Sequence, residues 1–395
     1  MTTGSMAVDT PELVQEVLAD EAPAGGHEKR LERYAKAKAR QALVVDYIEQ
    51  HPDASVKKRL DSEFKALLNC GSFLLFRHYY TLDQYKLIQG CTCKKHLLCA
   101  LCAIRRAAKC IAIYSEKINH VNEVSPVEFD ELMITFTVKN GEDLGERFDH
   151  LIDSMKKLLQ KRRDALKAKA QTDTPMKCLD GAVYSYEVTY TPDKGYHPHV
   201  HMIALVPSGV LQFDRVSIKG KSVDVPLAFR HGLIEDWRKI TQDSFVIDVR
   251  RIESTKTPLE GVDISGSRLE ALVEVFKYAL KMNQINKDES AGSADNVRIQ
   301  LDAYEVLRGR RLIGSFGNLW GVKIPENLND EPLTDEELPY VDLLYQYSGV
   351  TFGYQEISRT EGRSEPSDLK RELADQKAFM AKQRTKDLIL DSVSR

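Results

Sequence analysis

Three histidines alternate along one short apolar stretch of the sequence, Gly195 to Val206. Successive side chains of a strand point to opposite faces, so His197, His199 and His201 are predicted to share one face. Two imidazoles at adjacent positions of one face can bind the same divalent metal ion, and we expect His199 and His201 to do so. Pro198 has no N–H for a sheet, so the regular strand is predicted to begin after it, which leaves His197 beside the ligands.

A carboxylate in the preceding strand candidate, Ala182 to Tyr190, is the natural third ligand. Glu187 lies on the face of this strand that carries Val183, Ser185 and Thr189. A solvent-facing carboxylate is the alternative at this position. Two imidazoles and a carboxylate suit Mg²⁺ or Mn²⁺ with phosphate oxygens in the open positions, and Zn²⁺ accepts the same ligands.

A helix predicted from Arg268 to Met282 carries a second set of reactive side chains. Its helical period places Leu269, Leu272, Phe276 and Leu280 on the buried arc, and Glu270, Glu274, Lys277, Tyr278 and Lys281 on the opposite side. A phenol near a metal ion that polarises a phosphate can attack phosphorus, and a carboxylate one turn away can activate water. The alternative is an ordinary surface tyrosine, since the chain has 16 of them.

Four cysteines form a third group, Cys91, Cys93, Cys99 and Cys102, with His96 and Cys110 as further donors. Four thiolates are enough for a tetrahedral structural zinc, although the first pair has one intervening residue where the strongest pattern has two. Zinc is the preferred interpretation and free thiols the alternative. An odd total of seven cysteines is typical of a reducing compartment rather than of a disulfide framework.

The elements that position these residues alternate between strands and helices. Strands are predicted at Leu132–Val138, Ala182–Tyr190, His199–Val206 and Ser244–Ile252. The first of them turns Thr135 and Thr137 away from its apolar face. An amphipathic helix follows it, with an apolar stripe from Leu144 to Leu159. We therefore predict an α+β fold whose mainly antiparallel sheet has the histidine strand in its centre and the tyrosine helix packed beside it.

Composition and charge divide the chain into five segments. They are a flexible and helical lead (1–59), a Cys-rich helical domain (60–125), a catalytic domain (126–285), a C-terminal extension (286–356) and a charged tail (357–395). The net charge of −3 carries no overall signature of nucleic-acid binding, but basic residues gather locally at Lys94, Lys95, Arg105 and Arg106. No apolar run is long enough to span a membrane, and we expect a cytoplasmic protein.

Taken together, the motifs resemble those of a known family. The chain is similar to the rolling-circle plasmid replication initiators of the HUH endonuclease superfamily, which carry a Thr-rich strand, a His-hydrophobic-His strand and a Tyr-bearing helix in this order. The matching segments are Leu132–Asn140, Tyr196–Val206 and Glu274–Lys281. Glu274 four residues before Tyr278 resembles the subgroup with one catalytic tyrosine and a helper glutamate. The resemblance covers roughly Cys70 to Asn327, including the cysteine segment.

The resemblance implies a ferredoxin-like (RRM-like) catalytic domain and assigns the following roles. His199, His201 and Glu187 bind the metal ion, Tyr278 is the nucleophile, Glu274 is the base for terminating hydrolysis, and Lys281 lies by the phosphate or the DNA. His197, Thr135 and Thr137 contact the metal ligands or face the DNA. The implied reaction nicks single-stranded origin DNA, leaves a 5′-phosphotyrosine, and frees a 3′-hydroxyl that primes a host polymerase.

The implied partners are single-stranded and origin DNA, a host helicase, a host DNA polymerase and a second copy of the chain. Rival interpretations are a relaxase or single-strand transposase of the same superfamily, a zinc-dependent DNA-binding regulator without catalysis, and a metallohydrolase that uses free water.

Overall fold

The computed structural model describes residues 26–167, 172–218, 220–253, 266–277, 293–333 and 338–361. The helices are α2 (Gly26–Gln50), α3 (Ala54–Arg59), α4 (Asp61–Asn69), α5 (Ala100–Val124), α6 (Leu144–Leu166), η1 (Pro175–Cys178), α7 (Leu227–Thr241), α8 (Gly266–Phe276) and α10 (Ser293–Leu307). The strands are β1 (Phe73–Tyr79), β2 (Gln84–Gly90), β3 (Phe129–Thr137), β4 (Gly181–Thr191), β5 (Gly195–Pro207), β6 (Asp214–Ile218), β7 (Lys221–Val225), β8 (Ile247–Arg251), β9 (Ile313–Gly317), β10 (Val341–Ser348) and β11 (Gly353–Glu361).

A five-stranded sheet carries the predicted histidine strand in its centre. Its strand order is β8-β3-β5-β4-β9, and every neighbouring pair is antiparallel. Along the chain its first four strands and two helices follow as β3, α6, β4, β5, α7 and β8, which is the β-α-β-β-α-β order of the ferredoxin-like fold. The predicted α+β fold with a mainly antiparallel sheet is confirmed.

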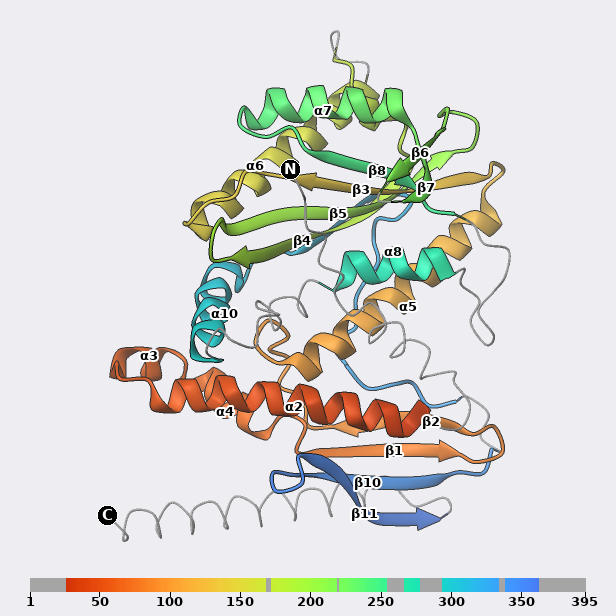
Figure 1. Ribbon diagram of the computed structural model, residues 1–395. Coiled ribbons are helices and arrows are strands. Elements are labelled where there is room, and N and C mark those ends of the chain that lie inside the picture. The colour runs from red at the N-terminus through yellow and green to blue at the C-terminus, as the bar shows by residue number, and fades with distance from the viewer. Residues whose placement is uncertain are drawn as a thin grey trace.

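Helices cover both faces of this five-stranded sheet, as Figure 1 shows. Helices α6 and α7 lie on one face, where the alternating residues Ile134 and Phe136 of β3 are buried. Trp237 of α7 packs against Phe136 in a tilted arrangement, with ring centroids 5.2 Å apart. Helices α5 and α8 lie on the other face. The apolar stripe predicted for α6 packs against the sheet, with Phe148 and Leu151 fully buried. The histidines of β5 therefore face α8 rather than α6.

A second sheet joins segments that are far apart in the sequence. Its order is β11-β10-β1-β2, so strands from residues 73–90 pair with strands from residues 341–361. Helix α2 lies between this sheet and the rest of the molecule (Figure 1). The sequence patterns indicated a mostly helical segment at 60–125 and did not reveal β1 and β2. They also missed β9, which joins the five-stranded sheet beside β4. The five-segment division itself remains a prediction.

A buried ion network ties the returning chain to the N-terminal helices. Asp330 lies between Arg30 of α2, at 2.9 Å, and Arg105 of α5. Arg105 also donates to the carbonyl oxygen of Leu328 (2.9 Å) and to the hydroxyl of Tyr34 (3.2 Å). Burial opposes ionisation of Asp330, but the two guanidinium groups hold its pKa below the usual value. Breaking one partner of such a buried pair leaves an uncompensated charge, so these residues act as one structural unit.

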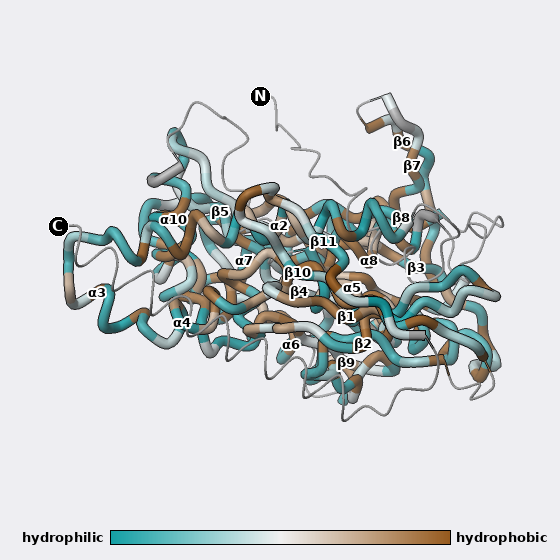
Figure 2. Tube along the Cα trace, turned by 90° about the horizontal axis from the view of Figure 1, so that it is seen from below, coloured by the Kyte–Doolittle hydropathy of each residue, from teal (hydrophilic) through white to brown (hydrophobic). Residues whose placement is uncertain are grey.

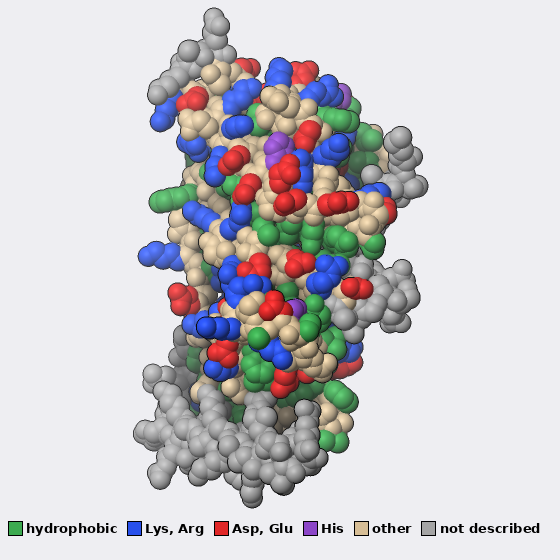
Figure 3. Space-filling view, turned by 90° about the vertical axis from the view of Figure 1, so that its left-hand side faces the viewer, with side chains coloured by type: hydrophobic (Ala, Val, Ile, Leu, Met, Phe, Trp, Pro, Cys, Tyr) green, Lys and Arg blue, Asp and Glu red, His purple; other side chains and the backbone are tan. Residues whose placement is uncertain are grey.

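The surface mixes charges of both signs. On the face seen in Figure 3, Lys and Arg side chains alternate with Asp and Glu, which agrees with the small net charge. Figure 2 shows hydrophilic residues along the exposed helix α3, none of whose residues is buried. Among the described residues, no helix is both long and apolar enough to cross a membrane.

Candidate functional site

The strand register assembles the predicted metal ligands. In the β4–β5 pair Glu187 lies opposite His199, and Ser185 lies opposite His201. Alternate residues of a strand share a face, so Glu187, His199 and His201 lie on the same side of the sheet. The carboxylate of Glu187 therefore reaches both histidines. Its Oε1 lies 3.4 Å from His199 Nε2, and its Oε2 lies 3.0 Å from His201 Nε2. The three side chains form a group whose ligand atoms all lie within 4.8 Å of one another, and all three are buried.

The other ring nitrogens of the two histidines are held by neighbouring groups. His199 Nδ1 donates to the carbonyl oxygen of His197 at 3.0 Å, which leaves Nε2 as the acceptor nitrogen of a neutral ring. His201 Nδ1 lies 3.1 Å from the hydroxyl of Thr135, the residue opposite it on β3. Contacts of this kind orient imidazole ligands and fix their tautomers. His197 lies next to His199, with ring centroids 5.1 Å apart, and is only half-buried.

The donor set suits a divalent cation. Burial lowers the pKa of His201, against the opposing effect of Glu187, so the ring favours the neutral form that ligates metals. Two imidazoles and one carboxylate converge on one point, with oxygen and nitrogen donors that Mg²⁺, Mn²⁺ and Zn²⁺ all accept. The solvent-facing alternative for Glu187 does not hold, because its side chain is fully buried.

Helix α8 brings a second carboxylate to this group. Glu274 Oε1 lies 3.3 Å from His201 Nε2. The helix is fixed to the sheet by Ser185, whose hydroxyl donates to the carbonyl oxygen of Val275, and to α5 by stacking of Phe276 on Tyr114, with ring centroids 5.3 Å apart. The helix that was predicted to lie beside the histidine strand therefore lies directly over its ligand face.

The polar side predicted for this helix is only partly correct. Leu269, Leu272 and Phe276 are buried as expected, and Glu270 is exposed. Lys277 was placed with the polar side, but it is buried and forms an ion pair with Glu274. The helical period missed this because α8 is covered on two sides, by the sheet and by α5. The candidate residues Tyr278, Leu280 and Lys281 lie outside the described residues.

The expectation for Pro198 is wrong. Strand β5 begins at Gly195 and runs through Pro198, which lies opposite Val188 of β4. On the β3 side, regular pairing ends at His199, and only an isolated bridge between Tyr196 and Gly141 follows. The N–H of Tyr196 points toward β3 and bonds to Gly141. The nitrogen of Pro198, two residues later, points to the same side, but it lies between this bridge and the first regular β3–β5 pair, so the N–H that proline lacks breaks no ladder bond.

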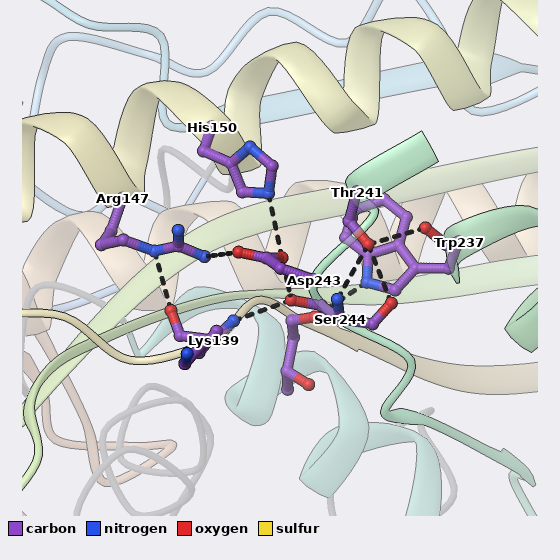
Figure 4. A network of polar contacts seen from close by, with 8 residues as sticks. Lys139, Arg147, His150, Trp237, Thr241, Asp243 and Ser244 are labelled. Carbon is purple, nitrogen blue, oxygen red and sulfur yellow. Dashed lines mark hydrogen bonds and ion pairs between the residues drawn. The ribbon is translucent and has the colours of Figure 1, made fainter. Parts of the chain in front are cut away.

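A polar network fixes the loops at this end of the sheet (Figure 4). Asp243, in the loop before β8, accepts from Arg147 of α6 at 2.8 Å and lies 3.2 Å from His150 Nε2. Burial opposes ionisation of Asp243, but hydrogen bonds from Ser244 and Arg147 lower its pKa. Ser244 in turn accepts from the backbone N–H of Lys139 at 2.8 Å. The loop after β3 is thus held against the loop before β8.

Thr137 belongs to this framework rather than to the ligands. It lies opposite His199, but its hydroxyl donates to the carbonyl oxygen of Val246 at 2.9 Å. Its own carbonyl accepts from the indole N–H of Trp237 at 2.8 Å. Of the two threonines singled out in the sequence, Thr135 contacts a candidate histidine ligand, whereas Thr137 bonds to the segment before β8.

Four cysteines form a second donor group, and their sulfur atoms all lie within 4.8 Å of one another. They are Cys70, Cys93, Cys99 and Cys102. Cys70 Sγ lies 3.5 Å from both Cys99 and Cys102, and Cys93 lies 3.6 Å from Cys102. Hydrogen bonds from the other thiols lower the pKa of Cys93, whereas burial raises that of Cys99. Such crowded sulfurs cannot all ionise without a cation, and a tetrahedral zinc fits this donor set.

The structure replaces one member of the predicted cysteine set. Cys91 is not part of the group, and Cys70 takes its position. The β1–β2 hairpin pairs Leu74 with Gly90, which brings the chain before β1 next to the chain after β2. Cys91 packs instead against the apolar outer face of the second sheet. The spacing of Cys91 and Cys93 gave no signal for this exchange, because alternation along an extended segment would put both side chains on the same face.

The predicted basic patch is also altered. Arg105 is 1% exposed and paired with Asp330, so its assignment as a DNA contact is wrong. Lys94 is exposed, Lys95 lies 3.3 Å from Glu63, and Arg106 is half-buried. For these three residues, DNA contact remains a prediction.

Comparison with known proteins identifies the family. A family model described as "Replication protein" matches residues 84–346, about two thirds of the chain. The chain belongs to this replication protein family. The match spans β2 to β10 and so includes the whole five-stranded sheet, both candidate histidine ligands and Glu274. Searches of curated proteins and of solved structures return no significant match.

Proposed function

We propose that this replication protein initiates rolling-circle replication of a plasmid by nicking one DNA strand at the origin. The observation that carries the proposal is the convergence of Glu187, His199 and His201 beneath α8, the helix that leads to Tyr278. Membership of the replication protein family supports the DNA substrate. Single-stranded origin DNA, a host helicase and a host polymerase are the expected partners.

In the proposed reaction the phenolic oxygen of Tyr278 attacks the scissile phosphorus. A P–O bond forms to the tyrosine, the bond from phosphorus to the 3′ oxygen breaks, and that oxygen leaves as a 3′-hydroxyl. A divalent ion held by Glu187, His199 and His201 supplies charge neutralisation at the phosphate. Thr135 and the carbonyl of His197 keep the two rings oriented. Lys281 is assigned to the phosphate or the DNA.

Termination uses water in place of a second tyrosine. Glu274 takes a proton from the water that attacks the phosphotyrosine, and the bond between phosphorus and Tyr278 breaks. The position of Glu274, with Oε1 3.3 Å from His201 Nε2, supports this role because it places the carboxylate beside the ligand group. A tetrahedral zinc held by the four grouped cysteines stabilises the region around α5 in this proposal.

The test is a denaturing gel of the full chain with single-stranded DNA from its own replicon and Mn²⁺. The native chain is expected to form a retarded covalent adduct, and Tyr278→Phe is expected to form none. His201→Ala, which keeps the tyrosine, is the control for metal dependence. Cleavage that survives Tyr278→Phe indicates a metallohydrolase, and DNA binding without cleavage by the native chain indicates a regulator.

A relaxase or a single-strand transposase of the same superfamily shares the nicking step but not the fate of the product. Addition of a polymerase and nucleotides to the nicked origin separates them. Extension of the 3′-hydroxyl with displacement of the attached strand supports replication, whereas joining of the strand to a second DNA supports transfer.

A further inference from the structure

A buried lysine, which the sequence motifs leave without a function, lies in contact with the candidate active site. The side chain of Lys277 is 4% exposed, and its ammonium forms an ion pair with Glu274 Oε2. Glu274 itself is 31% exposed and directs its other oxygen to His201. One carboxylate thus connects a buried cation to a candidate metal ligand.

The surroundings fix this arrangement. The backbone N–H of Lys277 donates to the carbonyl oxygen of Val273 at 3.0 Å, so the helical hydrogen bonding continues to the residue before Tyr278. Val275 accepts from Ser185, the residue opposite His201 on β4. This hydrogen bond fixes the position of helix α8 relative to β4 and β5, the two strands that carry the candidate ligands. A buried lysine at this point needs a charged partner, because transfer of an ammonium into the interior is costly.

Charge balance gives the lysine a function beyond packing. With both histidines neutral, as ligation requires, Glu187 and Glu274 carry two negative charges that match a divalent ion. Lys277 adds one positive charge, which leaves the site with a net charge of +1 when the ion is bound. A phosphodiester carries one negative charge, so the lysine makes the site complementary to its substrate rather than neutral.

We propose that Lys277 is a positioning residue that acts through Glu274. It holds the carboxylate so that one oxygen points to the ligand group, and its charge prevents Glu274 from binding the metal ion as a fourth protein ligand. This keeps a coordination position open for phosphate and keeps Glu274 available as the base of the terminating step. The inference rests on the proposed function for its consequence in catalysis, but its consequence for metal binding does not depend on nicking.

The first experiment is a calorimetric titration of the full chain with Mn²⁺. Lys277→Gln removes a positive charge close to the ion and releases Glu274, so the Mn²⁺ affinity is expected to rise about tenfold. Lys277→Arg keeps the charge and is expected to retain the native affinity. A residue that only packs the helix would lower the affinity when replaced, and unchanged or weaker binding by Lys277→Gln overturns the proposal.

A matched control is available on α6. Lys156 forms an ion pair with Asp153 at the same three-residue spacing, but both side chains are mostly exposed. Lys156→Gln changes the net charge by the same amount and is expected to leave Mn²⁺ affinity unchanged. The same titration of His201→Ala shows which part of the measured heat comes from Mn²⁺ binding at the candidate active site. If Lys277→Gln does not fold, Lys277→Met is titrated in its place, since buried ion-pair positions often accept apolar residues of similar volume.

The second experiment follows the covalent adduct. Lys277→Gln is expected to nick DNA and then release it about tenfold more slowly than the native chain, and the same is expected of Glu274→Gln. In a double mutant, Lys277→Gln is expected to add little to the effect of Glu274→Gln, because both act on one step. Additive effects on release overturn the inference. If the native chain forms no adduct, the proposed function fails, and the Mn²⁺ titration alone decides the inference about Lys277.

Discussion

The two donor groups of this protein are built in different ways. The Glu187, His199 and His201 group comes from two adjacent strands of one hairpin, whereas the four cysteines come from a helix end, a loop and the start of α5. The first group presents three protein ligands, which leaves open positions, and the second presents four, which closes the shell. We infer that the first serves chemistry and the second serves stability, and the difference leads to opposite expectations for loss of metal.

The largest effect is expected in the cysteine group. Cys99→Ala removes a fully buried ligand at the N-cap of α5, and we expect loss of bound zinc and an unfolding temperature lower by about 10 °C or more. Zinc content by mass spectrometry and a thermal melt measure both. Cys91→Ala is the matched control, because Cys91 lies outside the group, and it should retain zinc. Equal losses in the two variants would refute the assignment of Cys70 in place of Cys91.

A substitution in the Glu187, His199 and His201 group should lower activity rather than stability. His201→Ala removes one of two imidazoles, so Mn²⁺ binding and nicking are expected to fall at least a hundredfold. The unfolding temperature should change little, because the group joins two strands that a full ladder already pairs. Calorimetry and a thermal melt on the same sample check this. A collapse of stability comparable with that of Cys99→Ala would make this group structural too.

A smaller effect separates the two threonines of β3. Thr135→Val removes the hydroxyl that contacts His201 Nδ1, and loss of such a support typically lowers metal affinity about 10- to 100-fold. Thr137→Val, whose hydroxyl donates to Val246 instead, should leave the affinity within about twofold of native. Mn²⁺ titration of both variants is the measurement. Similar losses in both would mean that the strand end, rather than one hydroxyl, orients the histidines.

The smallest effect concerns acid and the second sheet. Burial, together with Arg30, lowers the pKa of His27 to about 3. Its ring stacks on Tyr85, with centroids 4.0 Å apart, and its Nε2 lies 3.1 Å from the Tyr345 hydroxyl. A histidine kept neutral in the folded state stabilises it fully above pH 6.5, and this contribution is lost as the pH falls from 6.5 toward 3.

His27→Phe should therefore weaken the acid dependence of stability. The native chain is expected to lose about 2 kcal/mol through this group by about pH 5, and the variant should not show that loss. His96, whose pKa burial lowers to about 4, contributes a remaining part in both chains. Urea unfolding at neutral and acidic pH measures the difference. An unchanged slope in His27→Phe would place the acid sensitivity elsewhere.

Local patterns in the sequence were enough for the parts of the site that lie on one strand. Alternation put His199 and His201 on one face, and the residues that flank Glu187 put it on the matching face of the next strand. The same reasoning gave strands β3, β4, β5 and β8 and helix α6, because periods of two and of 3.6 distinguish strands from helices over short windows. It did not give α7, the helix that completes the βαββαβ order. The predicted strands and the shared face of the histidines depend only on neighbours within a few residues, and the structure has them.

The tertiary structure decided what depends on distant segments. Cys70 joins the cysteine group because a hairpin returns the chain to it, and Arg105 is buried because Asp330 reaches it from more than two hundred residues away. Lys277 looked like a surface residue because the period of one helix does not reveal that a sheet and a second helix cover it. Sequence periodicity records which face of an element is apolar, but packing between elements decides which polar side chains become buried and what they then contact.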